Sequence, residues 1–377
     1  MRAQTELPAG HPATLSRRPV SVSVIGAGIL GLWQALVFAR AGYAVTLRDR
    51  SPDPLATSAS SYAGAMLAPD CEAEAAPAVV RRLGHRGLAL WRAEYPGLVQ
   101  AGSLVVAPTR DRAELVRFAR LTAGHQDLDE AGLAALEPGL AGRYARALYF
   151  PAEAHVVPAA AMAHLVGALV DAGGVVQFGT AATVGPAQRD DLPAGGLVVD
   201  CRGLAARDDL PGLRGVRGER VVVRARDVTL TRPVRLLHPR HPLYVVPWDD
   251  GRFMIGATVI ESEDAGPATV RSTLELLGAA YTLDPAFAEA EILDIGAGVR
   301  PAFDDNVPHV VLDLAHDRVF VNGAYRHGFL LAPVLAEACV QALQGPIEPH
   351  PLVVHASAIK GAHQSAASAL QVSGQVV

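Results

Sequence analysis

Three glycines near the N-terminus are spaced so that they could hold the pyrophosphate of a dinucleotide. They form the pattern Gly26-x-Gly28-x-x-Gly31, directly after the apolar, β-branched segment 20–25. In this pattern glycines allow a tight turn, a close approach of backbone to phosphate and close packing of a helix on a strand. Asp49 follows the next apolar segment, where a carboxylate can accept hydrogen bonds from ribose hydroxyls. The chemistry indicated is binding of a redox dinucleotide.

A strand, a helix and a second strand would position these residues. Segment 20–25 predicts the first strand, 32–41 an apolar helix that ends at Gly42, and 44–48 the second strand. The N-terminus of the helix would supply N–H groups and partial positive charge for the phosphates. The acid after the second strand makes NADP the least favoured dinucleotide, while FAD and NAD remain open. The alternative is a glycine-rich turn in an ordinary α/β protein.

Composition excludes several classes of protein. The 377 residues are 50% hydrophobic and 19% charged, which suits a large buried core rather than a disordered or fibrous chain. The net charge of -5 argues against a nucleic-acid partner. Three widely separated cysteines suit neither a close-spaced zinc site nor a secreted disulfide scaffold. We therefore expect no metal and a cytoplasmic location.

The N-terminal region resembles an export signal only superficially. Arg17 and Arg18 precede the apolar stretch 22–39, but the glycines in that stretch favour the strand-turn-helix interpretation. No segment offers the ~20 uninterrupted apolar residues that a membrane span needs. Residues 1–19 and 355–377 are expected to be flexible tails.

The rest of the chain predicts two kinds of sheet. Between residues 218 and 260 the strands follow one another without helices, and Asp250-Gly251 predicts a two-residue hairpin. An antiparallel sheet inside an otherwise parallel α/β chain indicates an inserted second domain. The expected helices are 77–95, 112–137, 158–172, 267–283 and 331–343, and the expected strands are 175–178, 197–200, 219–225, 229–237, 244–248, 252–259, 290–296 and 318–322.

A second strand-glycine-helix unit is predicted near the C-terminus. Segment 298–308 is rich in turn residues, and strand 318–322 leads into segment 325–328 and the last helix. Gly345 would stop that helix, and Pro333 would fall in its first turn, where proline is tolerated. The N-terminus of this helix would favour a ligand that becomes anionic, such as a reduced flavin.

Together these residues resemble the FAD-dependent D-amino-acid oxidase superfamily, and within it the glycine oxidases of the thiamine-biosynthesis (ThiO) type. The resemblance covers residues 20–345, and its most specific marks lie in segments 298–308 and 325–333. Further marks are the Gly26–Asp49 unit, segment 58–69 with Cys71-Glu72, Asp200-Cys201-Arg202-Gly203, Tyr244-Val-Val-Pro247 and Gly256-Ala257-Thr258. Segment 58–69, small and hydroxylated, can lay its backbone against a flat ligand, although a simple loop is the alternative.

The resemblance implies an α/β fold with two domains. A Rossmann-like FAD-binding domain with a parallel sheet would comprise residues 20–84, 150–210 and 296–345. An inserted α+β substrate domain with a mostly antiparallel sheet would comprise residues 85–149 and 211–295.

The resemblance also implies residue roles. Arg300 and Tyr244 would hold the substrate carboxylate, and Arg326 would lie beside the flavin and the substrate. A guanidinium suits this role because its planar fork pairs with a carboxylate through two parallel hydrogen bonds. Non-covalent FAD is expected, since Cys339 falls inside the last helix. The FAD-binding residues would be Gly26, Gly28, Gly31, Asp49, Ser60, Ser61, Ala65, Met66, Gly203, Arg326, His327 and Gly328.

Plainer roles stay open for these residues. Arg300 could be a structural ion-pair residue, Tyr244 a cross-strand aromatic and Arg326 a surface residue. His327 stands where members of the family often carry Asn, and it could be a packed histidine.

The implied activity is FAD-dependent oxidative deamination of glycine or another small amino acid or amine. Hydride transfer to the flavin, with O2 as acceptor, would give an imine or keto acid, ammonia and H2O2 for thiamine thiazole synthesis. The first alternative is a D-amino-acid dehydrogenase with a non-oxygen acceptor. A nicotinamide-dependent dehydrogenase and a non-enzymatic dinucleotide sensor also remain open. The expected partners are a small amino acid and O2, and a homo-oligomer and hand-over of the imine to a thiazole synthase are left open.

Overall fold

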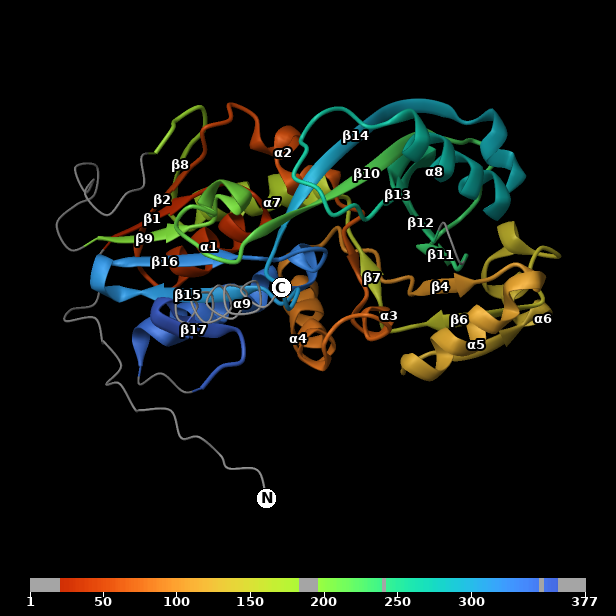
Figure 1. Ribbon diagram of the computed structural model, residues 1–377, viewed down its shortest axis with the longest axis horizontal. Helices are drawn as coiled ribbons and strands as arrows, with labels where there is room; N and C mark the ends of the chain where they lie inside the picture. The colour runs from red at the N-terminus through yellow and green to blue at the C-terminus, as the bar shows by residue number, and fades with distance from the viewer. Residues whose placement is uncertain (1–20, 183–195, 239–241, 346–348, 359–377) are drawn as a thin grey trace, which may run out of the picture.

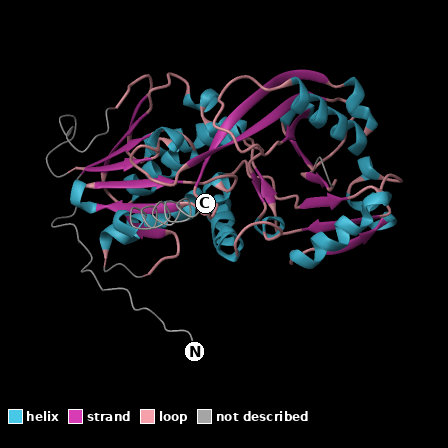
Figure 2. Ribbon diagram, in the orientation of Figure 1, coloured by secondary structure: helices cyan, strands magenta, loops and turns pink. Residues whose placement is uncertain are grey.

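Two large sheets form the framework of the structure, a computed structural model that describes residues 21–182, 196–238, 242–345 and 349–358. The sheet that contains β1 (Ser21–Ile25) lies at the left of Figure 1. The other contains the two longest strands, β10 (Arg214–Arg224) and β14 (Glu291–Ala302), which reach across the upper part of Figure 2. The predicted α/β class is confirmed.

The seven-stranded sheet is parallel at its centre. β1 pairs in parallel with a strand on each side, and the next strand outward, β16, is also parallel to its neighbour β9. These central strands are apolar and almost entirely buried, as expected when helices cover both faces of a sheet. The order across the sheet is β17 (Val353–His355), β15 (His309–Asp313), β16 (Arg318–Asn322), β9 (Leu197–Asp200), β1, β2 (Ala44–Arg48) and β8 (Val175–Gln177).

The main hydrophobic core lies between this sheet and four helices. α1 packs along both α7 and α9, and α4 packs along α9. Alternate residues of one strand face opposite sides: Val319 belongs to the main core and Phe320 to a smaller cluster on the other face. The helices are α1 (Ile29–Arg40), α4 (Ala78–Glu94), α7 (Pro158–Asp171) and α9 (Gly328–Gln344).

Pro333 lies inside α9, not in its first turn as predicted, because the helix already begins at Gly328. Proline has no N–H, so the carbonyl of Phe329, four residues earlier, loses its helical donor. The indole N–H of the fully buried Trp91 in α4 donates to that carbonyl at 2.6 Å. The proline is accommodated because a side chain of the neighbouring helix replaces the missing donor.

The second sheet has eight strands and is antiparallel except for one parallel pair, β4 with β11. A hairpin turns at Asp250-Gly251, as predicted, and both residues have positive φ, but the connection is longer than two residues: Asp249–Gly251 forms a 3-10 turn beyond the pair Trp248 and Arg252. One face of the sheet packs on α8 (Val270–Leu283). The order is β14, β10, β13 (Arg252–Gly256), β12 (Leu243–Pro247), β11 (Val234–Leu236), β4 (Ser103–Val106), β6 (Arg146–Phe150) and β5 (Gln126–Asp129).

Several expected elements differ from the structure, and of the expected strand 229–237 only Val234–Leu236 is a strand. Segment 112–137 is not one helical region: β5 separates α5 (Arg112–Leu121) from α6 (Glu130–Leu136). Asp129 ends β5 and caps α6 by accepting the Gly132 N–H, so a side chain fixes this boundary. The first part of the turn-rich segment 298–308 is strand, because β14 pairs with β10 as far as Ala302.

Short elements connect the two sheets. α2 (Pro54–Thr57), the 3-10 helix η1 (Ala59–Tyr62) and α3 (Pro69–Glu72) follow the first βαβ unit. Between the last two, β3 (Met66–Leu67) pairs with β7 (Ala154–His155) in a two-stranded sheet.

The domain boundaries and tails stay predictions. β14 runs through the expected boundary at residue 296, and α4 runs through the one at 85. Residues 1–19 lie outside the described part of the chain; of the C-terminal tail, His355 ends β17, and only residues up to 358 are described. Among the described residues, no helix combines the length and apolarity needed to cross a bilayer.

Candidate active site

The glycine-rich turn joins the end of β1 to the start of α1, as predicted. Gly26 has a φ of +99°, and a Cβ atom there would lie 2.6 Å from the carbonyl oxygen of Cys201. A Cβ atom at Gly31 would overlap the carbonyl oxygen of Gly26. Only glycine therefore fits at these two positions, one because of its conformation and the other because the helix approaches so closely.

Asp49 ties the turn to the end of β2. Its Oδ2 accepts the Ala27 N–H at 2.7 Å, and its Oδ1 accepts the Ser51 N–H at 2.8 Å. Each carboxylate oxygen has a second lone pair, so these contacts leave capacity for a ribose hydroxyl. The expected ribose contact stays a prediction.

The N-termini of α1 and α9 lie side by side. A Cβ atom at Gly328, the first residue of α9, would be 3.4 Å from Cγ2 of Ile29, the first residue of α1. The first turns of both helices contain no acidic residue. Two partial positive charges therefore meet at one place. FAD fits this arrangement, because its pyrophosphate and the N1–C2=O edge of its flavin are two groups that helix N-termini stabilise.

Segment 58–66 lies beside the N-terminus of α1. Ser60 Oγ accepts the Ile29 N–H at 3.0 Å, so Ser60 lies at the N-terminus of α1. Ser61 Oγ donates instead to the Leu55 carbonyl in α2. Ala65 has a φ of +49°, and Met66 continues from it into β3. The structure thus places Ser60, but not the Ser61 hydroxyl, against the predicted pyrophosphate site.

Segment 325–328 and the turn at Gly203 meet at the end of β14. The Tyr325 N–H donates to the Pro301 carbonyl at 2.8 Å. The Gly203 carbonyl accepts from Nδ2 of Asn322 at 2.9 Å, and a Cβ atom at Gly203 would be 3.7 Å from Pro301 Cγ. Three segments that are distant in sequence therefore converge beside Arg300.

Tyr244 and Arg300 lie on one face of the eight-stranded sheet. Tyr244 is opposite Gly256 in β13, and Gly256 is opposite Arg220 in β10. Opposite residues of antiparallel strands share a face. Two residues from Arg220, a Cβ atom at Gly218 would overlap the Arg300 guanidinium, so the Arg300 side chain lies on this face as well. The opposite face packs on α8.

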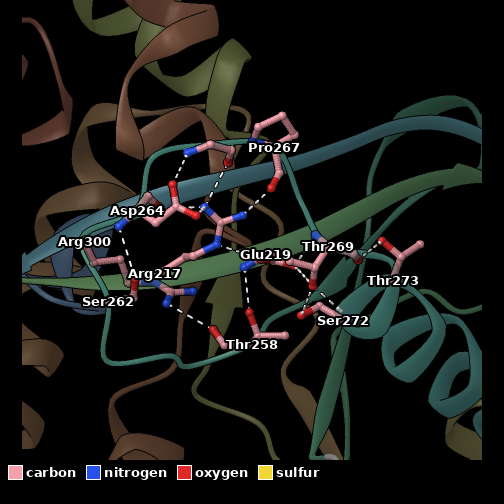
Figure 3. Close-up of polar contacts among 11 residues, drawn as sticks. Arg217, Glu219, Thr258, Ser262, Asp264, Pro267, Thr269, Ser272, Thr273 and Arg300 are labelled. Carbon is pink, nitrogen blue, oxygen red and sulfur yellow. Dashed lines mark hydrogen bonds and ion pairs between the residues drawn. The ribbon is translucent and has the colours of Figure 1, made fainter.

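The Arg300 guanidinium has few partners within the described residues. Its Nη1 donates to the Thr258 carbonyl at 3.2 Å, and no carboxylate of the described chain forms an ion pair with it. Arg217 on the other face of β10 is the contrast: it pairs with Glu219 and donates to three carbonyls of residues 264–267 (Figure 3). The Arg217 charge is neutralised in place, whereas that of Arg300 has no anionic partner among the described residues.

The Arg217–Glu219 pair also holds the loop that positions Arg300. Glu219 N–H donates to Thr258 Oγ1 at 2.8 Å, and its carboxylate accepts the Thr269 N–H at 3.0 Å. Figure 3 shows these contacts gathered along β10, with Arg300 reaching Thr258 from β14. Thr258 thus fixes one end of the Arg300 side chain.

Glu72 pairs with two arginines, of which Arg235 lies opposite Tyr244 on this same face of the sheet. Its Oε1 pairs with Arg235 at 2.8 Å, and its Oε2 lies 2.8 Å from Arg326 Nε and 3.4 Å from His327 Nδ1. Burial opposes ionisation of Glu72, but the neighbouring charges of Arg326 and Arg235 outweigh it and hold its pKa at about 2. Burial and the two arginines lower the pKa of His327 to about 4, so its ring is neutral at pH 7. Arg326 therefore has a fixed anionic partner.

Sequence reasoning missed three of these residues. Glu72 and Thr258 entered only as members of two motifs of the family resemblance, Cys71-Glu72 and Gly256-Ala257-Thr258, without a role of their own. Arg235 was missed altogether, because the alternation Val234-Arg235-Leu236 is equally typical of a strand with one solvent-exposed face.

A second buried carboxylate lies beside this cluster. Glu153 is fully buried and accepts the Cys71 N–H at 2.7 Å and the Ser103 hydroxyl. Burial raises its pKa to about 7, against the smaller opposing effects of these hydrogen bonds and of Arg235. At neutral pH this group is therefore close to half ionised.

The raised pKa of Glu153 predicts a pH-dependent stability. Since the folded-state pKa exceeds the unfolded value, the stabilisation is fully present below about pH 4.3 and is lost as pH rises through 7. Glu153→Gln cannot ionise, and it can keep both contacts if its Oε1 accepts the Cys71 N–H and its Nε2 donates to Ser103 Oγ. Urea unfolding should therefore show the variant gaining about 2 kcal/mol over the native chain between pH 5 and 7.

The quantity to measure is the difference in unfolding free energy between the variant and the native protein at each pH. His327, with its lowered pKa, makes the stability of both proteins rise with pH, and the difference removes this effect. Glu130→Gln, at an exposed position, serves as the control and should show a constant difference. If the difference in unfolding free energy between Glu153→Gln and the native protein were also independent of pH, the raised pKa of Glu153 would be contradicted.

Comparisons with known proteins agree with this geometry. The family model described as DAO, FAD dependent oxidoreductase, matches residues 21–342. A relative from Rhizobium etli named putative thiamine biosynthesis oxidoreductase ThiO is 51% identical over 316 residues, which cover 84% of this chain and 94% of the relative. A glycine oxidase from Geobacillus kaustophilus is 28% identical over 83% of this chain and 90% of its own.

The fold matches solved structures as well. The crystal structure of a glycine oxidase from Bacillus cereus superimposes with a TM-score of 0.74 and 22% identity, over 88% of this chain and 97% of the other. The resemblance stated from the sequence, including the ThiO type, is confirmed. Among the described residues, no cluster of three or more metal-ligating side chains was found. The chain belongs to the DAO family of FAD-dependent oxidoreductases.

Proposed function

We propose that this protein is an amino acid oxidase that deaminates glycine or another small amino acid or amine. The observation that carries the proposal is the Arg300 guanidinium, which has no acidic partner in the described chain and shares a sheet face with the Tyr244 side chain. A permanent planar cation and a neutral phenol donor suit the carboxylate of an amino acid. The relatives named ThiO and glycine oxidase support this substrate class.

FAD, which the residues at the N-termini of α1 and α9 would hold, would supply the redox chemistry that takes a hydride from the substrate Cα and delivers two electrons to O2 as H2O2. The residues of the chain bind and orient the substrate. Arg300 and Tyr244 hold the carboxylate, and Arg326, held by Glu72, lies at the start of α9. Fixing the carboxylate directs the Cα–H bond, and orientation of this kind contributes several kcal/mol to catalysis. Water then hydrolyses the free imine to a keto acid and ammonia.

Several finer points belong to the same proposal. FAD is held without a covalent bond, because all three cysteines are buried in the protein interior and Cys339 lies inside α9. The relative named ThiO supports a role in thiamine thiazole synthesis in the cytoplasm, with hand-over of the imine to a thiazole synthase.

The test is an anaerobic panel of amino acids mixed with the FAD-loaded protein. Glycine, sarcosine or D-alanine is expected to bleach the flavin absorption, and admission of air to restore it with one equivalent of H2O2. Bleaching without peroxide would favour the D-amino-acid dehydrogenase alternative. A flavin that no amine reduces would overturn the proposal.

A further inference from the structure

Four glycines lie on the sheet face that carries Arg300 and Tyr244. A glycine adds no side chain to a sheet, so the space above it belongs to whatever residue reaches over it from elsewhere. On this face each of the four is covered, and the covering side chains therefore set the room that is left beside Arg300. The glycines are Gly218, Gly256, Gly296 and Gly298.

The ring of Tyr62 covers the two glycines of β14. A Cβ atom at Gly296 would lie 2.5 Å from Tyr62 Cε1, and one at Gly298 would lie 3.1 Å from Tyr62 Cδ2. The guanidinium carbon of Arg220 lies 5.0 Å from the centroid of the same ring, which is a cation–π contact. These contacts hold the ring at one place on the sheet.

Tyr62 and Arg300 are neighbours on this face. A Cβ atom at Gly218 would overlap the Arg300 guanidinium, and Gly218 is directly opposite Gly298, which Tyr62 covers. Opposite residues of two antiparallel strands have their Cβ positions about 5 Å apart. The ring and the guanidinium therefore lie side by side over one pair of glycines, and the ring forms a wall beside the cation.

The Tyr62 side chain also reaches open space. Met254, which covers Gly256, is fully buried, whereas Tyr62 is half-buried, as are Arg300 and Tyr244. A molecule bound by Arg300 would therefore touch the Tyr62 ring, while Met254 belongs to the packed interior.

The segment that carries Tyr62 joins the two halves of the candidate site. Two residues before it, Ser60 accepts the Ile29 N–H at the N-terminus of α1. Two residues after it, a Cβ atom at Gly64 would lie 2.7 Å from Cε2 of Tyr244. Tyr62 therefore lies where the predicted FAD site and the substrate-binding face meet.

We propose that Tyr62 limits the size of the substrate, because its ring occupies the space beside Arg300 into which a bulky group on Cα or on the amine would extend. An acid bound by Arg300 then fits only if the groups beyond its carboxylate are small. This inference rests on the proposed function, since it assumes that Arg300 binds the substrate carboxylate. It adds to that function a residue that excludes large amino acids.

The test is titration of the FAD-loaded protein with four unreactive acids, followed by the shift in flavin absorption. Acetate, propanoate, 2-methylpropanoate and 2,2-dimethylpropanoate share the carboxylate and add one methyl group at a time to the same carbon. In an open apolar space each added methyl group would tighten binding. The native protein is instead expected to bind 2,2-dimethylpropanoate at least tenfold more weakly than acetate, because a methyl group meets the ring.

Two variants of Tyr62 separate the bulk of the ring from its hydroxyl. In Tyr62→Ala the ratio of the two dissociation constants should change by at least tenfold in favour of 2,2-dimethylpropanoate. The affinity for acetate should change little, because acetate needs none of the space that the ring fills. Tyr62→Phe keeps the ring and should retain the native ratio.

Tyr149→Ala is the matched control. Tyr149 is also half-buried, covers Gly102, and has the guanidinium carbon of Arg232 5.6 Å from its ring centroid. It belongs to β6, six strands along from β14 in the same sheet. At the usual spacing of strands this is roughly 25–30 Å from Tyr62, so the native ratio should persist.

Equal ratios in the native protein and Tyr62→Ala would overturn the role of Tyr62. Should Tyr62→Ala fail to fold, Tyr62→Leu takes its place with a smaller expected change, and the native protein also decides. If the native protein binds 2,2-dimethylpropanoate as tightly as acetate, the role of Tyr62 is overturned and the proposed function is left intact. Binding of none of the four acids by the native protein would overturn both.

Discussion

Replacement of Arg300 by methionine is expected to raise KM for glycine by a factor of about 30 to 1,000. This range corresponds to about 2–4 kcal/mol of lost carboxylate binding, since the variant keeps the bulk of the side chain but removes its paired donors. FAD should remain bound, because Arg300 lies on the second sheet and the glycine-rich turn belongs to the first. Steady-state kinetics and the flavin absorption of the purified variant measure both effects.

Two comparisons make the Arg300 result specific. Arg300→Lys keeps the charge without the planar fork, so its KM should fall between those of the native protein and Arg300→Met. Arg252→Met changes a half-buried arginine of the same sheet, whose Nε donates to the Asp249 carbonyl in its own turn, and should leave KM unchanged. An Arg300→Met variant with native KM would remove this residue from the site.

Replacement of Glu72 by glutamine is expected to lower the free energy of unfolding by about 3–5 kcal/mol. Such losses follow when one partner of a buried ion pair is removed and the other charge is left uncompensated. Here Arg235, with 17% of its side chain exposed, would lose its carboxylate partner. Urea unfolding at pH 7 measures the loss.

The control for Glu72 is Glu337→Gln, which breaks the exposed pair with Arg86. An exposed pair of this kind is worth about 0–1 kcal/mol. If Glu72 forms a buried ion pair, Glu72→Gln should lose clearly more unfolding free energy than Glu337→Gln. Equal losses in the two variants would argue against the buried pair. Because Glu72 also holds Arg326, kcat should fall in Glu72→Gln even under conditions where the variant is fully folded.

The first βαβ unit could be predicted from the sequence because its signals are local. The expected strand 44–48 coincides with β2, and the glycine pattern falls between β1 and α1. A second strand-glycine-helix unit near the C-terminus was also expected, and β16 leads into α9 there. In both units, the residues that set the geometry are neighbours in sequence, so spacing alone carries the information.

Long-range pairing could not be predicted in this way. β4, β5 and β6 were not expected, and they join the second sheet through β11, which is more than 80 residues away in sequence. The partners of Glu72 illustrate the same limit, since Arg235 and Arg326 come from distant elements. Which charges meet depends on how the two sheets pack, and no local pattern encodes that.

The indole of Trp91 makes positions 91 and 333 mutually dependent. An isosteric aromatic without an N–H would strand the Phe329 oxygen in an apolar interior, but only while residue 333 is an imino acid. With alanine at 333, the N–H of residue 333 would donate to the Phe329 carbonyl as in a regular helix. The Trp91 indole N–H would then have to share that carbonyl or lose its acceptor. Tolerance to substitution at either site is therefore a property of the pair.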